Sequence, residues 1–251
     1  MSDPNREFDK TCLKIFLYDG VHRDYAAHFF RWGYISSKII RKGDRVLDIG
    51  CGVQAPLARM IANTAESLSM IPSYYLGVDF NKAPRDIFNS RWADFRYEFN
   101  FPNRWKELTE EVYTFNVITC LEVVEHMRMP SVIKLLRGAG ELVTADGQLI
   151  LSTPVANGRP AKNHINEMTV PVLQQALEKT GWQVEKRFGT FASYNDIKKA
   201  ATPAHLKVLD AIRQYYSGAV AACFLAPLYP DASRNNIWIC RRQSSQIDDL
   251  L

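Results

Sequence analysis

The chain has 251 residues, of which 47% are apolar and 12% aromatic, and its formal net charge is +4. This length and apolar content suffice for a full α/β core and exclude extended disorder. No run approaches the roughly 18 apolar residues of a membrane span, so we expect no membrane insertion, and the mild charge does not require a nucleic-acid partner. The charged N-terminus lacks the apolar core of a secretory signal, so we expect a cytoplasmic protein.

The first clear pattern lies between residues 24 and 63. Residues 24–40 (DYAAHFFRWGYISSKII) have the apolar spacing of an amphipathic helix. Residues 46–49 (VLDI) then predict a buried strand that runs into a Gly-Cys-Gly turn at residues 50–52, and residues 55–63 can continue as a helix. Such a turn lets a ligand approach the backbone, and the helix start offers unpaired N–H groups. The third glycine of a dinucleotide-binding turn is missing, which disfavours a pyrophosphate ligand.

A second strand and a candidate third strand follow. Residues 74–79 (YYLGVD) predict a buried strand that ends in Asp79, and an acid at this point can accept hydrogen bonds from both ribose hydroxyls of a nucleoside. The polar residues 64–73 lengthen the connection and are expected at the surface. Residues 93–101 (ADFRYEFNF) are the candidate third strand.

Two further apolar runs complete the pattern of buried strands. Residues 115–121 (FNVITCL) pass directly into the polar segment EVVEH at residues 122–126. Residues 147–154 (GQLILSTP) end in a proline that stops ladder pairing. Because helical segments separate these strands, they predict a parallel sheet with right-handed crossovers.

The C-terminal part of the chain adds elements around a large insertion. After a polar loop at residues 155–167, the expected elements are a helix at 169–179 closed by Gly181, strands at 182–187 and 236–241, and helices at 194–200 and 203–216. The last two helices fall within residues 190–234, which we expect to form a lid or a substrate wall.

The cysteines do not form a disulfide or zinc pattern. The sequence contains five of them, with no C-x-x-C spacing. Cys51, Cys120 and Cys240 fall in predicted strands or in the glycine turn. We therefore interpret them as buried thiols in a reducing compartment.

The acid two residues before G-x-G, the second-strand acid and the order of the four strands resemble the core of class I S-adenosylmethionine (SAM)-dependent methyltransferases. The resemblance implies a Rossmann-like α/β fold, with a seven-stranded mostly parallel sheet, helices on both faces and a helical insertion between strands six and seven. We expect one domain over residues 1–251, in which the N-terminal segment 1–43 forms part of the pocket.

The resemblance also implies how SAM is held. The backbone of the turn lies against the methionine part, Asp48 orients the turn and reaches the amino group, and Asp79 takes the ribose. Phe80 packs on the adenine, and Leu121 lies beside the sulfonium. Phe99 or Asn100 is implied at the place of the acid that usually lies near the end of the third strand. The remaining cofactor contacts implied are Gly50, Cys51, Gly52 and Glu122.

Arg31 belongs to the segment FRWGYI, which resembles the L-R-x-x-Y-I segment of ubiquinone-biosynthesis O-methyltransferases. In those enzymes the arginine meets the cofactor carboxylate, and a guanidinium fork suits that group. A solvated arginine on an amphipathic helix stays open as the alternative.

The segment 122–126 is of the form E-x-x-E-H, found in the same ubiquinone enzymes and similar to small-RNA 3′-terminal 2′-O-methyltransferases. If the chain turns helical after Leu121, Glu122, Glu125 and His126 share one face. With His164 they imply a site for a divalent ion, Mg²⁺ or Mn²⁺, that binds acceptor oxygens. Similar runs also occur in methyltransferases without a metal.

Without a metal, His126 or His164 can act as general base toward a hydroxyl or amine. Glu167 then orients His164 or binds the substrate. The structural alternative is that residues 164–167 only cap the helix that starts near Thr169.

We therefore predict a SAM-dependent methyltransferase that O-methylates a hydroxylated small molecule or sugar. One alternative is methylation of nucleic acid, at a terminal ribose or a modified base. The other is a catalytically silent SAM-binding scaffold, against which the acids and histidines at positions 122, 126 and 164 argue. The sequence does not identify the acceptor.

Overall fold

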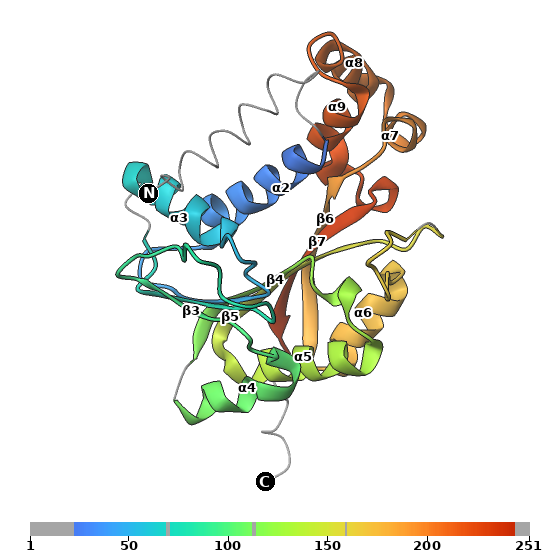
Figure 1. The fold of residues 1–251 in the computed structure, drawn as a ribbon. Coiled ribbons are helices and arrows are strands. Elements are labelled where there is room, and N and C mark those ends of the chain that lie inside the picture. Colours follow the sequence, from blue (N-terminus) through green and yellow to red (C-terminus); the bar gives the residue numbers. More distant parts are fainter. Residues whose placement is uncertain (1–22, 69–70, 112–113, 159, 244–251) are drawn as a thin grey trace. The chain divides into compact units, whose positions relative to one another are not determined.

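The strands form a seven-stranded sheet in the order β3-β2-β1-β4-β5-β7-β6. Figure 1 shows the fold as a ribbon. The computed structural model describes residues 23–68, 71–111, 114–158 and 160–243, so the first 22 residues of the predicted N-terminal segment lie outside the described part. The strands are β1 (Arg45–Ile49), β2 (Tyr74–Val78), β3 (Ala93–Arg96), β4 (Phe115–Leu121), β5 (Val143–Pro154), β6 (Trp182–Phe191) and β7 (Asn235–Arg242).

Strand pairing brings the ends of the central strands to one edge. β1 pairs in parallel with β2 and with β4, and Asp48 lies opposite Gly77 on one side and Thr119 on the other. β2 with β3 and β4 with β5 are also parallel, and the sheet contains one antiparallel hairpin. The predicted seven-stranded, mostly parallel sheet is therefore confirmed. Its parallel strands place their carboxyl ends, and the residues that follow them, along a single edge.

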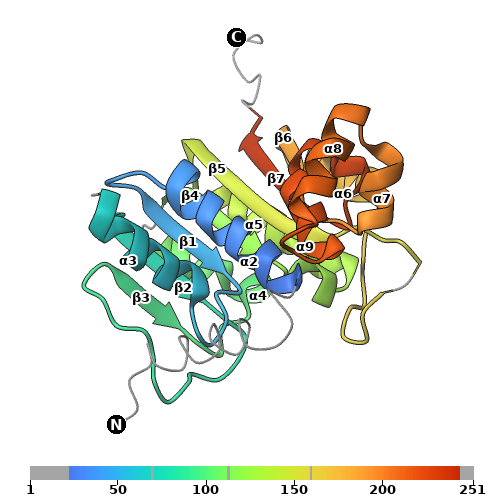
Figure 2. The same ribbon diagram turned by 90° about the horizontal axis from the view of Figure 1, so that it is seen from above.

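The chain divides into two compact units, residues 34–187 with 237–251 and residues 1–33 with 188–236. In the first unit, α3 lies on one face of the sheet and α4 and α5 on the other (Figure 2). Ile118 and Leu149 on the strands share one buried core with Leu135 of α5. The helical elements of this unit are η1 (Ile35–Ile39), α3 (Pro56–Leu68), α4 (Phe101–Glu110), η2 (Val124–His126), α5 (Met129–Leu142) and α6 (Val170–Lys179).

Several element boundaries differ from the sequence predictions. β3 ends at Arg96 instead of residue 101, β6 continues to Phe191 instead of residue 187, and α8 ends at Ile212 instead of residue 216. α3 was expected to end at residue 63, but it continues to Leu68 and so takes up part of the expected surface insert. Residues 69–70 of that insert lie outside the described part. β5 begins at Val143 instead of residue 147, because its first residues extend the ladder beside Phe115 of β4.

The second unit contains most of the predicted insertion. Its helical elements are α2 (Arg23–Tyr34), α7 (Tyr194–Ala200), α8 (Pro203–Ile212), α9 (Gly218–Leu225), η3 (Ala226–Leu228) and η4 (Pro230–Ala232). Ile197, Leu209 and Ala222 form a small core of its own. The sequence analysis missed α9, which begins where the Ser217 hydroxyl accepts a hydrogen bond from the Val220 amide. The roles of residues 190–234 as a lid and of residues 1–43 as a pocket wall stay predictions.

The buried thiols agree with the sequence analysis. Within the described ranges, the cysteines Cys51, Cys120, Cys223 and Cys240 are buried thiols. No helix in the described part of the chain is long and apolar enough to cross a membrane.

Candidate functional site

The glycine turn after β1 has a backbone that only glycine adopts easily. Gly50 and Gly52 have φ angles of +74° and +70°. The amides of Gly50 and Cys51 both donate to the Val78 carbonyl, at 2.8 and 3.2 Å, so the turn is tied to β2. A Cβ atom on Gly50 would collide with Val123, whereas one on Gly52 would meet no atom closer than 3.9 Å. The turn is therefore packed on one side and open at Gly52.

Asp79 connects this turn to the loop after β2. Its Oδ2 accepts a hydrogen bond from the Gly52 amide at 2.8 Å. Its Oδ1 accepts from the backbone and side-chain amides of Asn81, both at 2.8 Å. A carboxylate offers about four acceptor positions. Three donors thus hold Asp79 in place and leave it capacity for a ribose hydroxyl, which is the role predicted for it.

Asp48 is buried at the end of β1. The Tyr75 hydroxyl donates to its Oδ2 at 2.5 Å, and the Thr119 hydroxyl donates to its Oδ1 at 2.6 Å. Burial raises the pKa of Asp48 to about 6, while these two hydrogen bonds oppose the rise. The sequence analysis missed Tyr75 and Thr119. The sequence places both on buried strands but gives no signal that they meet Asp48, because that contact depends on the register of three strands.

The residues predicted beside the adenine have different surroundings. Phe80, directly after Asp79, is 74% exposed and so offers an uncovered aromatic face. Phe99 is buried in the core, with the Arg104 guanidinium 4.6 Å from its ring centre. Asn100 precedes α4, and its carbonyl accepts the first backbone hydrogen bonds of that helix. Among these, Phe80 has the surroundings of a ligand platform and Phe99 those of a core residue.

The chain does not turn α-helical directly after Leu121, which corrects the expectation for the E-x-x-E-H segment. Glu122 has a left-handed backbone, with φ of +59°, and only a short 3₁₀ turn over Val124–His126 follows. The Glu122 amide donates to the Ser152 carbonyl at 3.0 Å, and its Oε1 accepts from the Ser152 hydroxyl at 2.8 Å. Glu122 therefore does not share a helix face with Glu125 and His126. Strained backbone at a strand end is common in functional sites.

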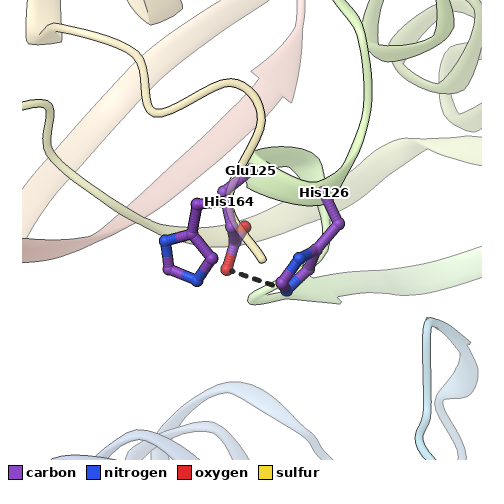
Figure 3. Close-up of side chains that lie close together, drawn as sticks. All are labelled: Glu125, His126 and His164. Atoms are coloured by element: carbon purple, nitrogen blue, oxygen red, sulfur yellow. Dashed lines mark ion pairs between the residues drawn. The ribbon is translucent and has the colours of Figure 1, made fainter. Parts of the chain in front are cut away.

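Glu125 and His126, in the turn after β4, lie close to His164, in the loop after β5 (Figure 3). One side-chain nitrogen or oxygen from each lies within 4.8 Å of the others. Nε2 of His126 is 3.9 Å from Oε1 of Glu125, and the two imidazole rings are 5.0 Å apart and nearly perpendicular. Glu125 is buried, and its other oxygen accepts from Thr153 at 3.2 Å. The structure thus brings together three of the four predicted metal ligands, and Glu122 is outside this group.

Each histidine is oriented through its Nδ1 atom. Nδ1 of His126 lies 2.9 Å from the Asn163 carbonyl, which can only accept, so this nitrogen carries the proton. Nδ1 of His164 lies 2.7 Å from Oε1 of Glu167 and donates to that carboxylate. In the neutral rings both Nε2 atoms therefore keep their lone pairs, as a general base or a metal ligand requires.

The loop that carries His164 is fastened to the same short turn. The Glu125 carbonyl accepts from the amides of Ile165 and Asn166, at 2.9 and 3.0 Å. Thr169, and not Asn166, is the N-cap residue of α6, and its side chain makes no capping hydrogen bond. The capping alternative for residues 164–167 therefore does not describe this loop, and Glu167 instead contacts His164.

Arg31 belongs to the second unit, and its partners there are polar. Its Nη2 donates to Oδ1 of Asn235 at 3.3 Å, and Nη1 lies 3.2 Å from Nδ1 of His28. Oδ1 of Asn235 also accepts from the Thr190 hydroxyl at 2.9 Å. Arg31 is buried, so a solvated arginine is not observed. Its contact with a cofactor carboxylate stays a prediction.

Comparison with known proteins identifies the class of protein that this fold and site define. A family model described as a methyltransferase domain matches residues 34–209. The chain belongs to this methyltransferase family, and the resemblance to class I SAM-dependent methyltransferases is confirmed.

Ubiquinone biosynthesis O-methyltransferases are among the curated relatives of this chain. The chain is 28% identical over 124 residues to that of Coxiella burnetii (strain RSA 493 / Nine Mile phase I) and 32% identical over 127 residues to that of Neisseria meningitidis serogroup C (strain 053442). Each match covers 49% of this chain and 49% of the relative. The chain thus spans about half the length of the curated relatives it matches.

Solved structures share the fold. A SAM-dependent methyltransferase from Archaeoglobus fulgidus is 15% identical, with a TM-score of 0.55, over 88% of this chain and 95% of that one. An O-methyltransferase from neocarzinostatin biosynthesis, solved with SAM and 2-hydroxy-5-methyl naphthoic acid, is 12% identical with a TM-score of 0.51. That match covers 88% of this chain and 56% of the other. At these identities the likeness concerns the fold alone.

Proposed function

We propose that the protein transfers the methyl group of SAM to a hydroxyl oxygen of a small-molecule or sugar acceptor. The observation that carries this proposal is the pair of oriented histidines, His126 and His164, at the carboxyl edge that also holds the glycine turn and Asp79. The names of the matching relatives, which are O-methyltransferases, support oxygen as the acceptor atom. That the acceptor is a small molecule or a sugar is part of the proposal.

In the proposed reaction, a hydroxyl oxygen of the acceptor attacks the methyl carbon in line with the bond to sulfur. The new oxygen–carbon bond forms while the carbon–sulfur bond breaks, and the bonding pair stays on sulfur. The hydroxyl proton passes to Nε2 of His164 or His126. Glu167 supports a base at His164, because its carboxylate stabilises the imidazolium that forms. Most of the acceleration comes from holding acceptor and methyl group in line.

A direct assay tests the proposal. The full chain is incubated with methyl-labelled SAM and with phenolic acceptors, sugars, RNA or DNA in separate reactions. We expect transfer to a hydroxylated small molecule, and we expect His164→Gln and His126→Gln to reduce it without changing the affinity for S-adenosylhomocysteine. Transfer to RNA or DNA alone would favour the nucleic-acid alternative. Cofactor binding without any transfer would favour a silent scaffold.

We further propose that Glu125, His126 and His164 hold a divalent metal ion. Two imidazole nitrogens and one carboxylate within 4.8 Å of one another form a fitting donor set, and both rings are oriented by acceptors at Nδ1. Of the two predicted ions, Mn²⁺ fits these nitrogen donors better than Mg²⁺, which prefers oxygen. When bound, the ion would lower the pKa of an acceptor hydroxyl. His126 and His164 would then serve as ligands and not as bases.

Metal binding can be measured without an acceptor. Titration calorimetry with Mn²⁺ or Mg²⁺ should show one site in the wild-type chain and none in His164→Ala. His205 belongs to the other unit and contacts Tyr229, so His205→Ala should bind Mn²⁺ like the wild type. Equal binding by all three proteins, or methyl transfer that survives exhaustive chelation, would contradict the metal site.

A further inference from the structure

A buried bridge of hydrogen bonds joins three strands beneath the glycine turn. The Asp48 carboxylate of β1 accepts one hydrogen bond from Tyr75 of β2 and one from Thr119 of β4. Their side chains are almost completely shielded from solvent. Thr119 lies directly beside Asp48 in the parallel register, whereas Tyr75 reaches it past Gly77, which has no side chain in the way. The bridge therefore depends on the register of all three strands.

The bridge holds a charge that burial opposes. An ionised carboxylate accepts both hydroxyl hydrogen bonds, whereas a protonated one loses acceptor capacity, so Tyr75 and Thr119 favour the ionised form. Asp79, Cys51 and Cys120 are further titratable groups that interact with Asp48. The charge of Asp79 raises the pKa of Asp48. Burial raises the pKa values of the Cys51 thiol and of Tyr75 above their usual ranges, so both stay neutral. Burial raises the pKa of Asp48 to about 6, against the effect of the two hydroxyl hydrogen bonds.

We propose that Tyr75 and Thr119 are positioning residues for cofactor binding, whose hydroxyls keep Asp48 ionised beneath the glycine turn so that it attracts the ammonium group of SAM. The inference rests on the proposed cofactor site and adds residues that the motif itself does not contain. The Asp48 carboxylate is two residues before Gly50, whose amide is fixed to β2 by the Val78 carbonyl. A fixed anion at this point acts on a cationic ligand without having to move.

The inference predicts a particular pH dependence. In the wild type, affinity for a ligand with an ammonium group should fall as the pH drops through about 6, because protonated Asp48 no longer attracts it. Loss of one hydroxyl removes a hydrogen bond that favours the charged form. The pKa of Asp48 should then rise by about one unit, since a hydrogen bond to a charged group differs in strength by that order between the two protonation states. In such a variant, the loss of ligand affinity on acidification should therefore begin at a higher pH than in the wild type.

Calorimetry with S-adenosylhomocysteine on the full chain, between pH 5 and 8, tests this. In Tyr75→Phe and in Thr119→Val, the fall in affinity at acidic pH should occur about one pH unit higher than in the wild type. At pH 8 each variant should bind S-adenosylhomocysteine within about twofold of the wild-type affinity. Thr119→Ser keeps a hydroxyl and should restore the wild-type profile. Tyr74→Phe, which removes a hydroxyl from the neighbouring residue near Arg45, should leave the profile unchanged.

The outcomes separate a positioning role from a structural one. A loss of affinity that is equal at every pH would mean that the hydroxyls only support the fold, and it would overturn the inference. So would a wild-type affinity that does not depend on pH, although the cofactor site would stand. If the wild type does not bind S-adenosylhomocysteine at all, the proposed function fails with the inference. If Thr119→Val does not fold, the pH profiles of Tyr75→Phe and Thr119→Ser still test the inference.

Discussion

The two glycines of the turn should respond differently to the same substitution. Gly50→Ala and Gly52→Ala both place a side chain on a left-handed backbone, which costs about 1–2 kcal/mol of unfolding free energy. Only at Gly50 does the added Cβ also collide with Val123, and such overpacking costs about 1–3 kcal/mol more. We therefore expect losses of about 1–2 kcal/mol for Gly52→Ala and about 2–5 kcal/mol for Gly50→Ala.

Thermal unfolding and calorimetry with S-adenosylhomocysteine can be compared on the two variants. At about 2–4 °C per kcal/mol for a chain of this size, Gly50→Ala should lower Tm clearly more than Gly52→Ala. Gly52→Ala should instead lose cofactor affinity, because its Cβ points to the open side of the turn. Gly50→Ala combined with Val123→Ala should recover part of the lost stability. Equal Tm values for the two single variants, or no recovery in the double variant, would refute the packing argument.

Three further predictions concern single side chains. Glu167→Gln should lower methyl transfer about tenfold or more while the affinity for S-adenosylhomocysteine stays constant, because only the partner of His164 changes; a parallel loss of affinity would contradict this. Phe80→Ala should weaken cofactor binding roughly 5- to 100-fold through lost stacking on adenine, with an unchanged Tm because the ring is exposed; unchanged affinity would remove Phe80 from the site. Asp48→Asn should stabilise the fold at pH 8 by up to about 3 kcal/mol, because the folded-state pKa lies near 6 and the ordinary value is 3.8. Protonated Asp48 stabilises the wild-type fold fully below about pH 4, and this stabilisation is lost as the pH rises through 6. The Tm of Asp48→Asn should therefore exceed that of the wild type by a growing margin over this interval. A margin that shrinks with rising pH would mean that the folded-state pKa of Asp48 is lowered and not raised.

The sequence predicted the parts of the fold that depend on local pattern. The apolar runs of β1, β2, β4 and β5 and the glycine turn after Ile49 follow from composition and order alone. Because parallel strands end at one edge, the sequence also indicated that Asp79 and the segment after Leu121 would lie there. These predictions needed no knowledge of side-chain contacts.

The contacts that shape the site depend on register and loops. The Tyr75–Asp48–Thr119 bridge exists only when three strands align in one register, which no local pattern encodes. The left-handed Glu122 could not be foreseen, because a glutamate normally continues a helix and its conformation here is tied to Ser152 on β5. α9 was missed because its run of apolar residues lacks the polar face that marks an amphipathic helix.

Glu125 contributes to the site in two ways, through its side-chain carboxylate and through its backbone carbonyl. Its side chain belongs to the cluster with the histidines, whereas its backbone carbonyl accepts the hydrogen bonds from Ile165 and Asn166 that help to hold the loop. Any residue at position 125 presents the same carbonyl. The side chain at this position can therefore change without removing these two hydrogen bonds to the loop that carries His164. A different metal ligand or acid could be placed here on the same backbone.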